Sequence, residues 1–274
     1  LLWQAVRGDA TITIVGTMHV WDPRLDDLVG DVIPLLIEAD HALFEMTAEE
    51  QGQLMQALID DPSITTITTG PTLPEMLDDA TWQALSQAAS DHGIPSFMAA
   101  KMQPWFLATT LSMPACAMQA MTDGRLGLDF MLMEEAAQAG IPTGALEPWD
   151  TLLRLFDSVT LDEQIDLLRI SLVAPELQNA IFVSMLDGYF DGRVAEIWEM
   201  NQFAMELMPE TVSADFMAES EELLLTQRNQ DWIPVIEAAA AAHDNLFVGA
   251  GAAHLPGEDG VLRLLERNGW TWHR

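Results

Sequence analysis

The chain has 274 residues, of which 49% are hydrophobic and nine are tryptophan, so it encodes a globular protein with a sizeable core and not a disordered chain. Its 43 acidic residues outnumber its 11 basic residues and give a net charge of −32. Such a surface repels phosphates and anionic lipid headgroups, which argues against nucleic acid and acidic membranes as partners. The simplest explanation of the charge is solubility or adaptation to salt. The sequence contains no apolar run of about 18 residues, so we expect no transmembrane segment in it.

Short apolar or β-branched segments alternate with longer helical segments along most of the chain. ATITIVG is typical of a strand, whereas TAEE, at residues 47–50, is a helix start signal. The predicted strands are residues 10–16, 41–46, 94–99, 141–147, 245–251 and 270–273. The predicted helices between them are residues 24–40, a helix from residue 47, residues 79–92, residues 104–139 with a break around Asp123 and Gly124, and residues 257–269.

A long stretch, residues 148–242, reads as nearly continuous helix. Its expected breaks are at Pro175, Gly188, Gly192 and Pro209. We interpret this stretch as a helical insertion or cap over a sheet formed by the rest of the chain. The alternation of strands and helices elsewhere predicts a single α/β domain over residues 1–274, with a mostly parallel or mixed central sheet flanked by helices.

Polar residues follow the ends of the predicted strands. In chain order they are His19, Glu45, Lys101, Glu147 and His254. Both histidines stand in Gly-x-x-His motifs, in which the glycine lets the backbone turn off the strand. Because the carboxyl ends of parallel strands share one edge, where ligands bind, we expect these side chains to converge. Two imidazoles and a carboxylate suit a first-row divalent metal, which would activate water while a free glutamate moves a proton.

Two blocks of the sequence carry a family resemblance. GTMH near the amino end and FVGAGAAHLPGEDGVLRLLERNGW near the carboxyl end resemble the signature blocks of the TraB/GumN family, which includes the pheromone-shutdown proteins and the Tiki proteases that cleave Wnt. LFEM carries the family's early glutamate, KMQPWFLA resembles its Pro-Trp block and QRNQDWI its Arg-Asn block. GLDFMLMEEAAQAGIPTGALE resembles the central block that runs from Gly-x-Asp to Leu-Glu, so the resemblance covers most of the chain.

The resemblance implies a fold similar to that of the erythromycin-esterase and ChaN-like group, and metal-dependent hydrolysis of peptide or protein substrates. Mn²⁺ or Co²⁺ would be the metal, with Zn²⁺ as a further candidate. The implied metal ligands are His19, His254 and Glu45, and the implied catalytic residues are Glu45, Glu147 and Arg228. An arginine facing the scissile carbonyl could stabilise the oxyanion. Asn229 is an expected substrate contact. Lys101, judged from its place after a predicted strand, is expected either to contact a substrate carboxylate or to form an ion pair with one of the many acidic residues. The family also implies a bacterial periplasmic or envelope location, with any targeting segment removed before Leu1.

Several residues allow a second interpretation. Asp129 either supports a metal ligand or caps a helix. Six methionines could line a peptide groove, although core packing is the simpler explanation: Met102, Met113, Met118, Met121, Met131 and Met133. The remaining histidines, His41, His92, His243 and His273, are expected to be structural. Cys116 is the single cysteine, and its apolar neighbours suggest a buried thiol.

Two other functions are compatible with the same residues. One is a binding protein that captures a peptide or haem in the groove without chemistry. The other is ester hydrolysis without a metal, in which a histidine acts as general base.

Overall fold

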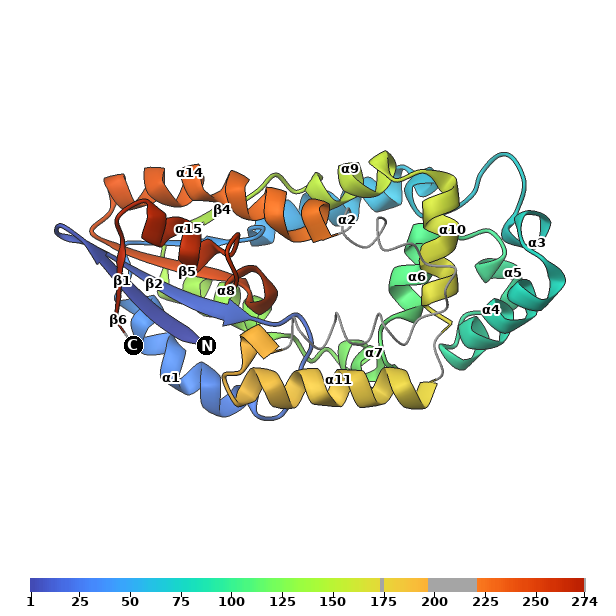
Figure 1. Ribbon diagram of the computed structural model, residues 1–274, viewed down its shortest axis with the longest axis horizontal. Coiled ribbons are helices and arrows are strands. Elements are labelled where there is room, and N and C mark those ends of the chain that lie inside the picture. Colours follow the sequence, from blue (N-terminus) through green and yellow to red (C-terminus); the bar gives the residue numbers. More distant parts are fainter. Residues whose placement is uncertain (173–174, 197–220, 274) are drawn as a thin grey trace.

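The computed structural model describes residues 1–172, 175–196 and 221–273 (Figure 1). The expected helix break at Pro209 therefore lies outside the described residues. Within them, six strands form one mixed sheet in the order β4-β3-β5-β2-β1-β6. The strands are β1 (Leu2–Arg7), β2 (Ala10–Thr17), β3 (His41–Phe44), β4 (Thr143–Ala145), β5 (Asn245–Gly251) and β6 (Thr271–His273). The predicted α/β class is confirmed.

Four neighbouring strands of this sheet run parallel. β5 pairs in parallel with β2 on one side and with β3 on the other, and β3 pairs in parallel with β4. β1 and β6 complete the sheet as antiparallel strands. The pairing of β2 with β5 brings the two ends of the chain together, since Ile14 lies opposite Val248.

The side chains of the central strands alternate between two cores, as the pleat of a strand requires. Ile14 and Val248 pack into one core, under α14 (Gln227–Ala242) and α15 (Val261–Arg267). Val15 and Phe247 pack into the other, under α1 (Leu25–Ile37) and α8 (Leu128–Ala139). The sheet is thus a three-layer unit with helices on both faces.

The remaining helices form a second part of the molecule, beyond the carboxyl edge of the parallel strands (Figure 1). They come from the segment between β3 and β4 and from the segment after β4. Their bounds are α2 (Ala48–Asp60), η1 (Pro62–Ile64), α3 (Leu73–Met76), α4 (Asp79–Asp91), α5 (Ser96–Ala99), α6 (Pro104–Leu111), α7 (Ala115–Thr122), α9 (Thr151–Ser158), α10 (Leu161–Ile170) and α11 (Pro175–Phe190). A separate core, which includes Leu85, Leu107 and Leu168, holds α4, α6 and α10 together.

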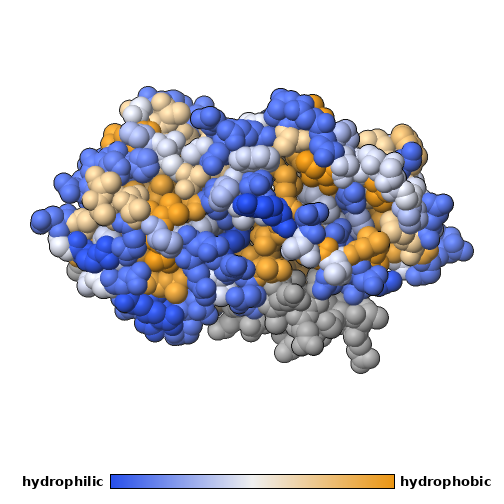
Figure 2. Space-filling model, turned by 90° about the horizontal axis from the view of Figure 1, so that it is seen from above, coloured by the Kyte–Doolittle hydropathy of each residue, from blue (hydrophilic) through white to orange (hydrophobic). Residues whose placement is uncertain are grey.

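Two features of this arrangement differ from a simple cap after residue 148. The segment before β4 supplies α2 to α7, so the helical part is built from two stretches of chain. At the other end of the predicted insertion, α14 lies on the sheet, where Trp232 and Ile236 are fully buried. In the described ranges, no helix is both long and apolar enough to span a membrane. Viewed from above, the surface is mostly hydrophilic, with small groups of apolar residues exposed in several places across the face (Figure 2).

The strand predicted at residues 94–99 is wrong. Ser96–Ala99 forms the short helix α5, in which the N–H of Ala100 donates to the carbonyl of Ser96 over 2.9 Å. Apolar composition alone cannot separate a short strand from a helical turn, and Phe97 is exposed where a central strand would be buried. Lys101 therefore follows no strand, and α5 lies at the end of the molecule opposite the sheet (Figure 1).

The buried thiol predicted at Cys116 is also wrong, because Cys116 is exposed. It lies on α7, where Ala117 and Ala120 are buried and Gln119 is exposed. Neighbouring positions of a helix point in different directions, so apolar neighbours in the sequence do not predict a buried Cys116 thiol.

Three other histidines make structural contacts. Both ring nitrogens of His92, at the end of α4, lie within hydrogen-bonding distance of carbonyl oxygens, those of Ala88 at 2.9 Å and Met113 at 3.0 Å. His41 and His243 stack with their ring centroids 4.8 Å apart and their planes 5° from parallel. These contacts agree with the structural roles expected for them.

The stacked pair predicts a pH dependence of stability. Burial, and then the neighbouring His243, lower the pKa of His41 below 6.5. The folded protein therefore binds this proton more weakly than the unfolded chain, and stability falls as the pH drops below about 6.5. We expect His41→Gln to lose less stability than the wild type between about pH 7.5 and pH 5 in urea unfolding. Equal losses in the two proteins would contradict the assignment.

Candidate active site

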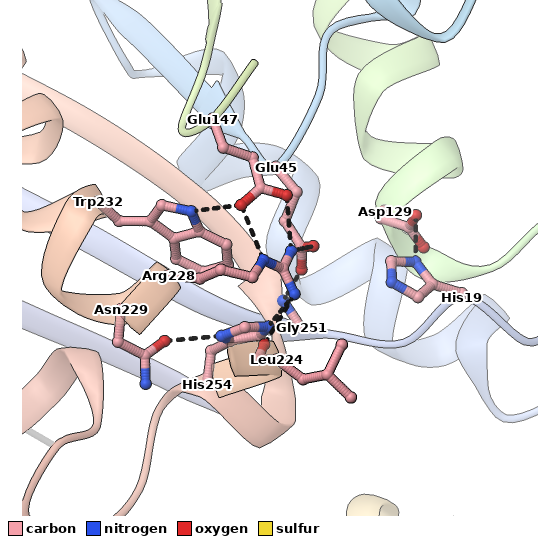
Figure 3. Close-up of polar contacts among 10 residues, drawn as sticks. All are labelled: His19, Glu45, Asp129, Glu147, Leu224, Arg228, Asn229, Trp232, Gly251 and His254. Carbon is pink, nitrogen blue, oxygen red and sulfur yellow. Dashed lines mark hydrogen bonds and ion pairs between the residues drawn. The ribbon is translucent and has the colours of Figure 1, made fainter. Parts of the chain in front are cut away.

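Four of the predicted residues meet at the carboxyl edge of the parallel strands (Figure 3). His19 follows β2 by two residues, Glu45 follows β3 directly, and Glu147 follows β4 by two residues. His254 ends the short helix η3 (Ala252–His254) that follows β5. They meet because β2, β5, β3 and β4 all run in the same direction. Lys101 does not belong to this group.

The guanidinium of Arg228 lies at the centre of the group. It is buried near the start of α14, and its Nε and Nη2 donate to the two oxygens of Glu147 over 2.8 and 2.7 Å. Nη2 also donates to Glu45 Oε2 over 2.9 Å, while Nη1 contacts the carbonyl of Leu224 at 3.0 Å and His254 Nε2 at 3.2 Å. These contacts use all five N–H donors of an arginine. The arrangement thus favours a positioning role for Arg228 over contact with a substrate oxyanion.

His254 is held as a neutral acceptor. Its Nδ1 lies 2.6 Å from Asn229 Oδ1, and Asn229 Nδ2 donates to the carbonyl of Asp259 over 2.9 Å. Nδ1 therefore carries the proton, and Nε2 accepts from Arg228. Burial lowers the pKa of His254 to about 4, because the charged imidazolium would lose its hydration.

Trp232 belongs to the same cluster, although the sequence analysis did not identify it. Its Nε1 donates to Glu147 Oε2 over 2.9 Å, and its ring lies 4.3 Å from the His254 ring between centroids. Trp232 is four residues after Arg228 on α14, a spacing that puts both side chains on one face of the helix. The spacing of Arg and Trp within QRNQDWI could therefore have indicated that Trp232 lies beside Arg228.

Glu45 is held as a carboxylate. Its Oε1 accepts from the backbone N–H of Gly251 over 2.7 Å, and its Oε2 accepts from Arg228. Burial alone would raise the pKa of Glu45, but His254 in its protonated form, the positive charges of His19 and Arg228, and the Gly251 hydrogen bond lower it below its usual value. Glu45 is thus an anion at neutral pH, beside both histidines.

His19 forms a separate pair with Asp129. His19 Nδ1 lies 2.7 Å from Asp129 Oδ2, at the first turn of α8 (Figure 3). This hydrogen bond is the main cause that raises the pKa of His19 to about 9, so the ring is cationic at neutral pH. The side chain of His19 is 62% exposed, and among the described residues its Nε2 has no hydrogen-bond partner. Asp129 therefore orients an imidazole whose second nitrogen is open.

Gly127 sets the position of His19 through a close backbone approach. A Cβ atom at Gly127 would lie 2.4 Å from the carbonyl carbon of His19 and 2.4 Å from the carbonyl oxygen of Met18. The N–H of Leu128 donates to that same Met18 oxygen over 2.9 Å. The glycine of GLDF therefore lets α8 begin directly against the loop that carries His19.

We expect Gly127→Ala to destabilise the protein by about 1–3 kcal/mol, because backbone atoms must move to relieve the overlap. The control is Gly52→Ala in the interior of α2, where a Cβ meets no atom within 4 Å. That change should stabilise the protein by about 0.5–1 kcal/mol, since alanine loses less conformational entropy in a helix. Urea unfolding measures both. Equal effects of the two changes would show that the Gly127 contact is not needed.

A cavity of about 290 Å³ opens beside these residues. Its polar lining comes from Thr17, His19, Glu45, Gln51, Asp129 and Glu147. Arg228 and His254 do not line it: Arg228 donates to Glu45 and Glu147, and His254 contacts Arg228. Asn229 lines a different cavity, of about 300 Å³, together with Glu221, Glu258 and Asp259. Of the two substrate contacts expected from sequence, neither Asn229 nor Lys101 lines the cavity of His19.

Within the part of the chain that the structure describes, no three His, Cys, Asp or Glu side chains are arranged to hold a metal ion together. Some atoms beside the cavity nevertheless have no hydrogen-bond partner among the described residues. Besides His19 Nε2, Asp129 Oδ1 and Thr17 Oγ1 are buried without a hydrogen-bond partner among the described residues. Buried polar atoms of this kind call for an explanation, and a bound ion, water or ligand is one of the usual ones.

The fold and the site define an α/β protein with a charged cavity at the carboxyl edge of its parallel strands. The chain matches the model of the TraB/PrgY/gumN family over residues 1–274, and it belongs to that family. No curated protein and no solved structure matches the chain. The family predicted from the Gly-x-x-His blocks is thus confirmed.

Proposed function

We propose that this protein is a hydrolase that cleaves peptide bonds at the cavity lined by His19 and Glu45, with the help of a divalent metal ion. The observation that carries the proposal is the convergence of the His19–Asp129 pair and the Glu45 carboxylate on one cavity. In parallel α/β sheets, this edge is where ligands bind. Separated charge states of neighbouring acidic and basic groups are typical of catalytic sites.

The types of nitrogen and oxygen atom beside the cavity suit a divalent ion. His19 Nε2 and the oxygens of Glu45 and Asp129 form the mixed nitrogen and oxygen set that Mn²⁺, Co²⁺ or Zn²⁺ accepts. His254 fits less well, because its Nε2 faces Arg228 and would have to exchange that contact. Fewer than three ligands are in place, so water or substrate would supply the rest. When bound, such an ion would polarise the scissile carbonyl and lower the pKa of a water molecule.

The residues of the chain have distinct parts in this proposal. Glu45 is the general base or a ligand, since its carboxylate is ionised and lines the cavity. Asp129 fixes the orientation of the His19 ring. Arg228 donates to Glu45 and fixes its carboxylate, Glu147 holds Arg228, and Trp232 donates to Glu147.

The charge states also favour a second candidate, hydrolysis without a metal. At neutral pH the His19 imidazolium can donate a proton to the leaving group, and the Glu45 carboxylate can accept one from water. Both candidates use the same cavity, and they differ in whether chelation stops the reaction.

Metal analysis of the purified protein and its variants tests the proposal. We expect bound Mn²⁺, Co²⁺ or Zn²⁺ in the wild type, none after His19→Ala, and metal binding that strengthens as the pH rises toward about 9, because His19 must release its proton. Loss of metal in His254→Ala would show that His254 Nε2 exchanges its contact with Arg228 for the metal ion. Peptide cleavage that survives exhaustive chelation would support the metal-free candidate.

The same preparation, incubated with a peptide library, separates catalysis from binding. Tight binding of a peptide or of haem without cleavage, with metal present, would overturn the proposal in favour of a binding protein. The proposed periplasmic or envelope location rests on the family resemblance. Cell fractionation tests this location, and detection of the protein in the cytoplasmic fraction alone would contradict it.

A further inference from the structure

The cavity that His19 and Glu45 line has a second, apolar side. Its apolar lining comes from Val20, Phe44, Met46, Met113, Met121, Phe130, Met133 and Leu152. Four of these eight side chains are methionine, and they come from the loop after β3, the segment before α7, α7 itself and α8. Three of them, Met113, Met121 and Met133, are among the methionines for which the sequence allowed a peptide groove.

These methionines do not serve core packing alone. Met133 is buried against the sheet, but Met121 is 52% exposed although it is a large apolar side chain. Met113 is half-buried. Methionine is flexible and polarisable, so a wall of methionines adapts to different apolar groups. An apolar wall that is open to a cavity beside charged groups is typical of a binding pocket.

The polar floor of the cavity suits a peptide backbone. Asp129 Oδ1 and Thr17 Oγ1 are buried without a partner among the described residues, and both residues line the cavity. Asp129 can accept from a backbone N–H, and the Thr17 hydroxyl can donate to a carbonyl. A hydrocarbon chain without polar groups would leave both atoms unsatisfied, which is costly.

The volume of the cavity and the charges that line it limit which peptide side chain it can bind. A volume of about 290 Å³ is at the lower end for ligand pockets, so it holds one or two side chains and not a whole folded segment. Glu45, Glu147 and Asp129 at the polar end repel an acidic side chain. A lysine ammonium group would gain little from these carboxylates, because Arg228 and His19 already pair with them, and it would lose its hydration on entering the methionine wall.

We propose that this methionine-lined pocket binds one long apolar side chain, of the size of leucine, methionine or phenylalanine, next to the bond that is cleaved. This inference rests on the proposed function for the position of that bond, but the binding preference itself does not need catalysis. The pocket thereby makes Met113 and Met121 specificity-determining residues.

The test uses blocked pentapeptides of the form Gly-Gly-Xaa-Gly-Gly, with Xaa as Leu, Phe, Lys or Asp, and protein labelled with ¹³C at the methionine methyl groups. We expect the Leu and Phe peptides to shift the methyl signals of Met113, Met121 and Met133, and to bind roughly tenfold or more tightly than the Lys and Asp peptides. Equal affinity for all four peptides, or methyl signals that no peptide shifts, would overturn the inference.

A pair of matched variants gives the control. Met121→Glu should weaken binding of the Leu peptide roughly tenfold or more, because a carboxylate then faces the apolar side chain. Met98→Glu, at a methionine with the same 52% exposure on α5, should leave binding unchanged. If Met121→Glu does not fold, as judged by circular dichroism, Met113→Glu takes its place. Equal binding by a folded pocket variant and by Met98→Glu would count against the pocket.

Binding and cleavage are measured on the same peptides, so the two proposals can fail separately. A Leu and Phe preference without any cleavage would leave the pocket standing and overturn the hydrolase. Cleavage at the same rate for all four peptides would leave the hydrolase standing and overturn the pocket.

Discussion

Glu45→Gln is expected to lower kcat/KM for a cleaved peptide by about 10²–10⁴-fold, the range of a lost general acid or base. The reason is the charge of Glu45, whose pKa lies below its usual value so that it is an anion at neutral pH. Glutamine keeps the shape of the side chain and one acceptor oxygen. Its neutral amide cannot accept a proton from water, and it offers no negative charge to a metal ion. Steady-state kinetics with a fluorogenic peptide measure the effect.

The control for this prediction is Glu49→Gln. Glu49 is exposed in the first turn of α2, four residues further along the chain, and it does not line the cavity. It should change kcat/KM by less than about twofold, since a distant exposed charge is screened by salt. A Glu45→Gln variant that is folded and keeps wild-type activity would remove Glu45 from the chemistry. A rise in KM at unchanged kcat would instead indicate a role in binding alone.

Much of the fold could be predicted because the relevant signals are local. The segments that became β2 and β5 are short and apolar, and each ends in the glycine that begins a Gly-x-x-His motif. The strand β1 was missed, because Gln4 and Arg7 interrupt the apolar residues of LWQAVR and only Ala5 is fully buried. Residues 94–99 were assigned wrongly for the opposite reason, since an apolar stretch that begins at Ile94 forms a partly exposed helical turn.

The sequence predicted that the residues at the strand ends lie close together, but it did not predict which of them form hydrogen bonds and ion pairs with each other. Parallel strand direction is enough to bring Glu45, Glu147 and His254 to one edge. It does not reveal that Arg228 lies between them, because Arg228 comes from α14, 81 residues after Glu147 in the chain. The pairing of His19 with Asp129 spans 110 residues in the same way. Such contacts depend on how helices pack over the sheet, which periodicity within a segment does not encode.

The buried ion pairs of Arg228 with Glu45 and Glu147 predict the largest effect of a substitution on stability. Arg228→Met should destabilise the protein by about 3–5 kcal/mol, the usual cost of removing one partner of a buried ion pair. Without the guanidinium, Glu147 keeps only the Trp232 N–H among its side-chain contacts, and Glu45 keeps only the Gly251 N–H. Both carboxylates would then be buried charges without a cation in contact.

A second substitution separates unpaired charge from lost packing. In the double variant Arg228→Met, Glu147→Gln, the amide oxygen can still accept from Trp232 without carrying a charge. We expect it to recover more than about 0.5 kcal/mol relative to the sum of the single changes. The control is Arg263→Met on α15, a 49% exposed arginine paired with Glu258 and Glu266, which should cost less than about 1 kcal/mol. Urea unfolding of the wild type, the two single variants Arg228→Met and Glu147→Gln, the double variant and Arg263→Met measures these differences. If Arg228→Met costs no more than Arg263→Met, Arg228 does not hold this site together.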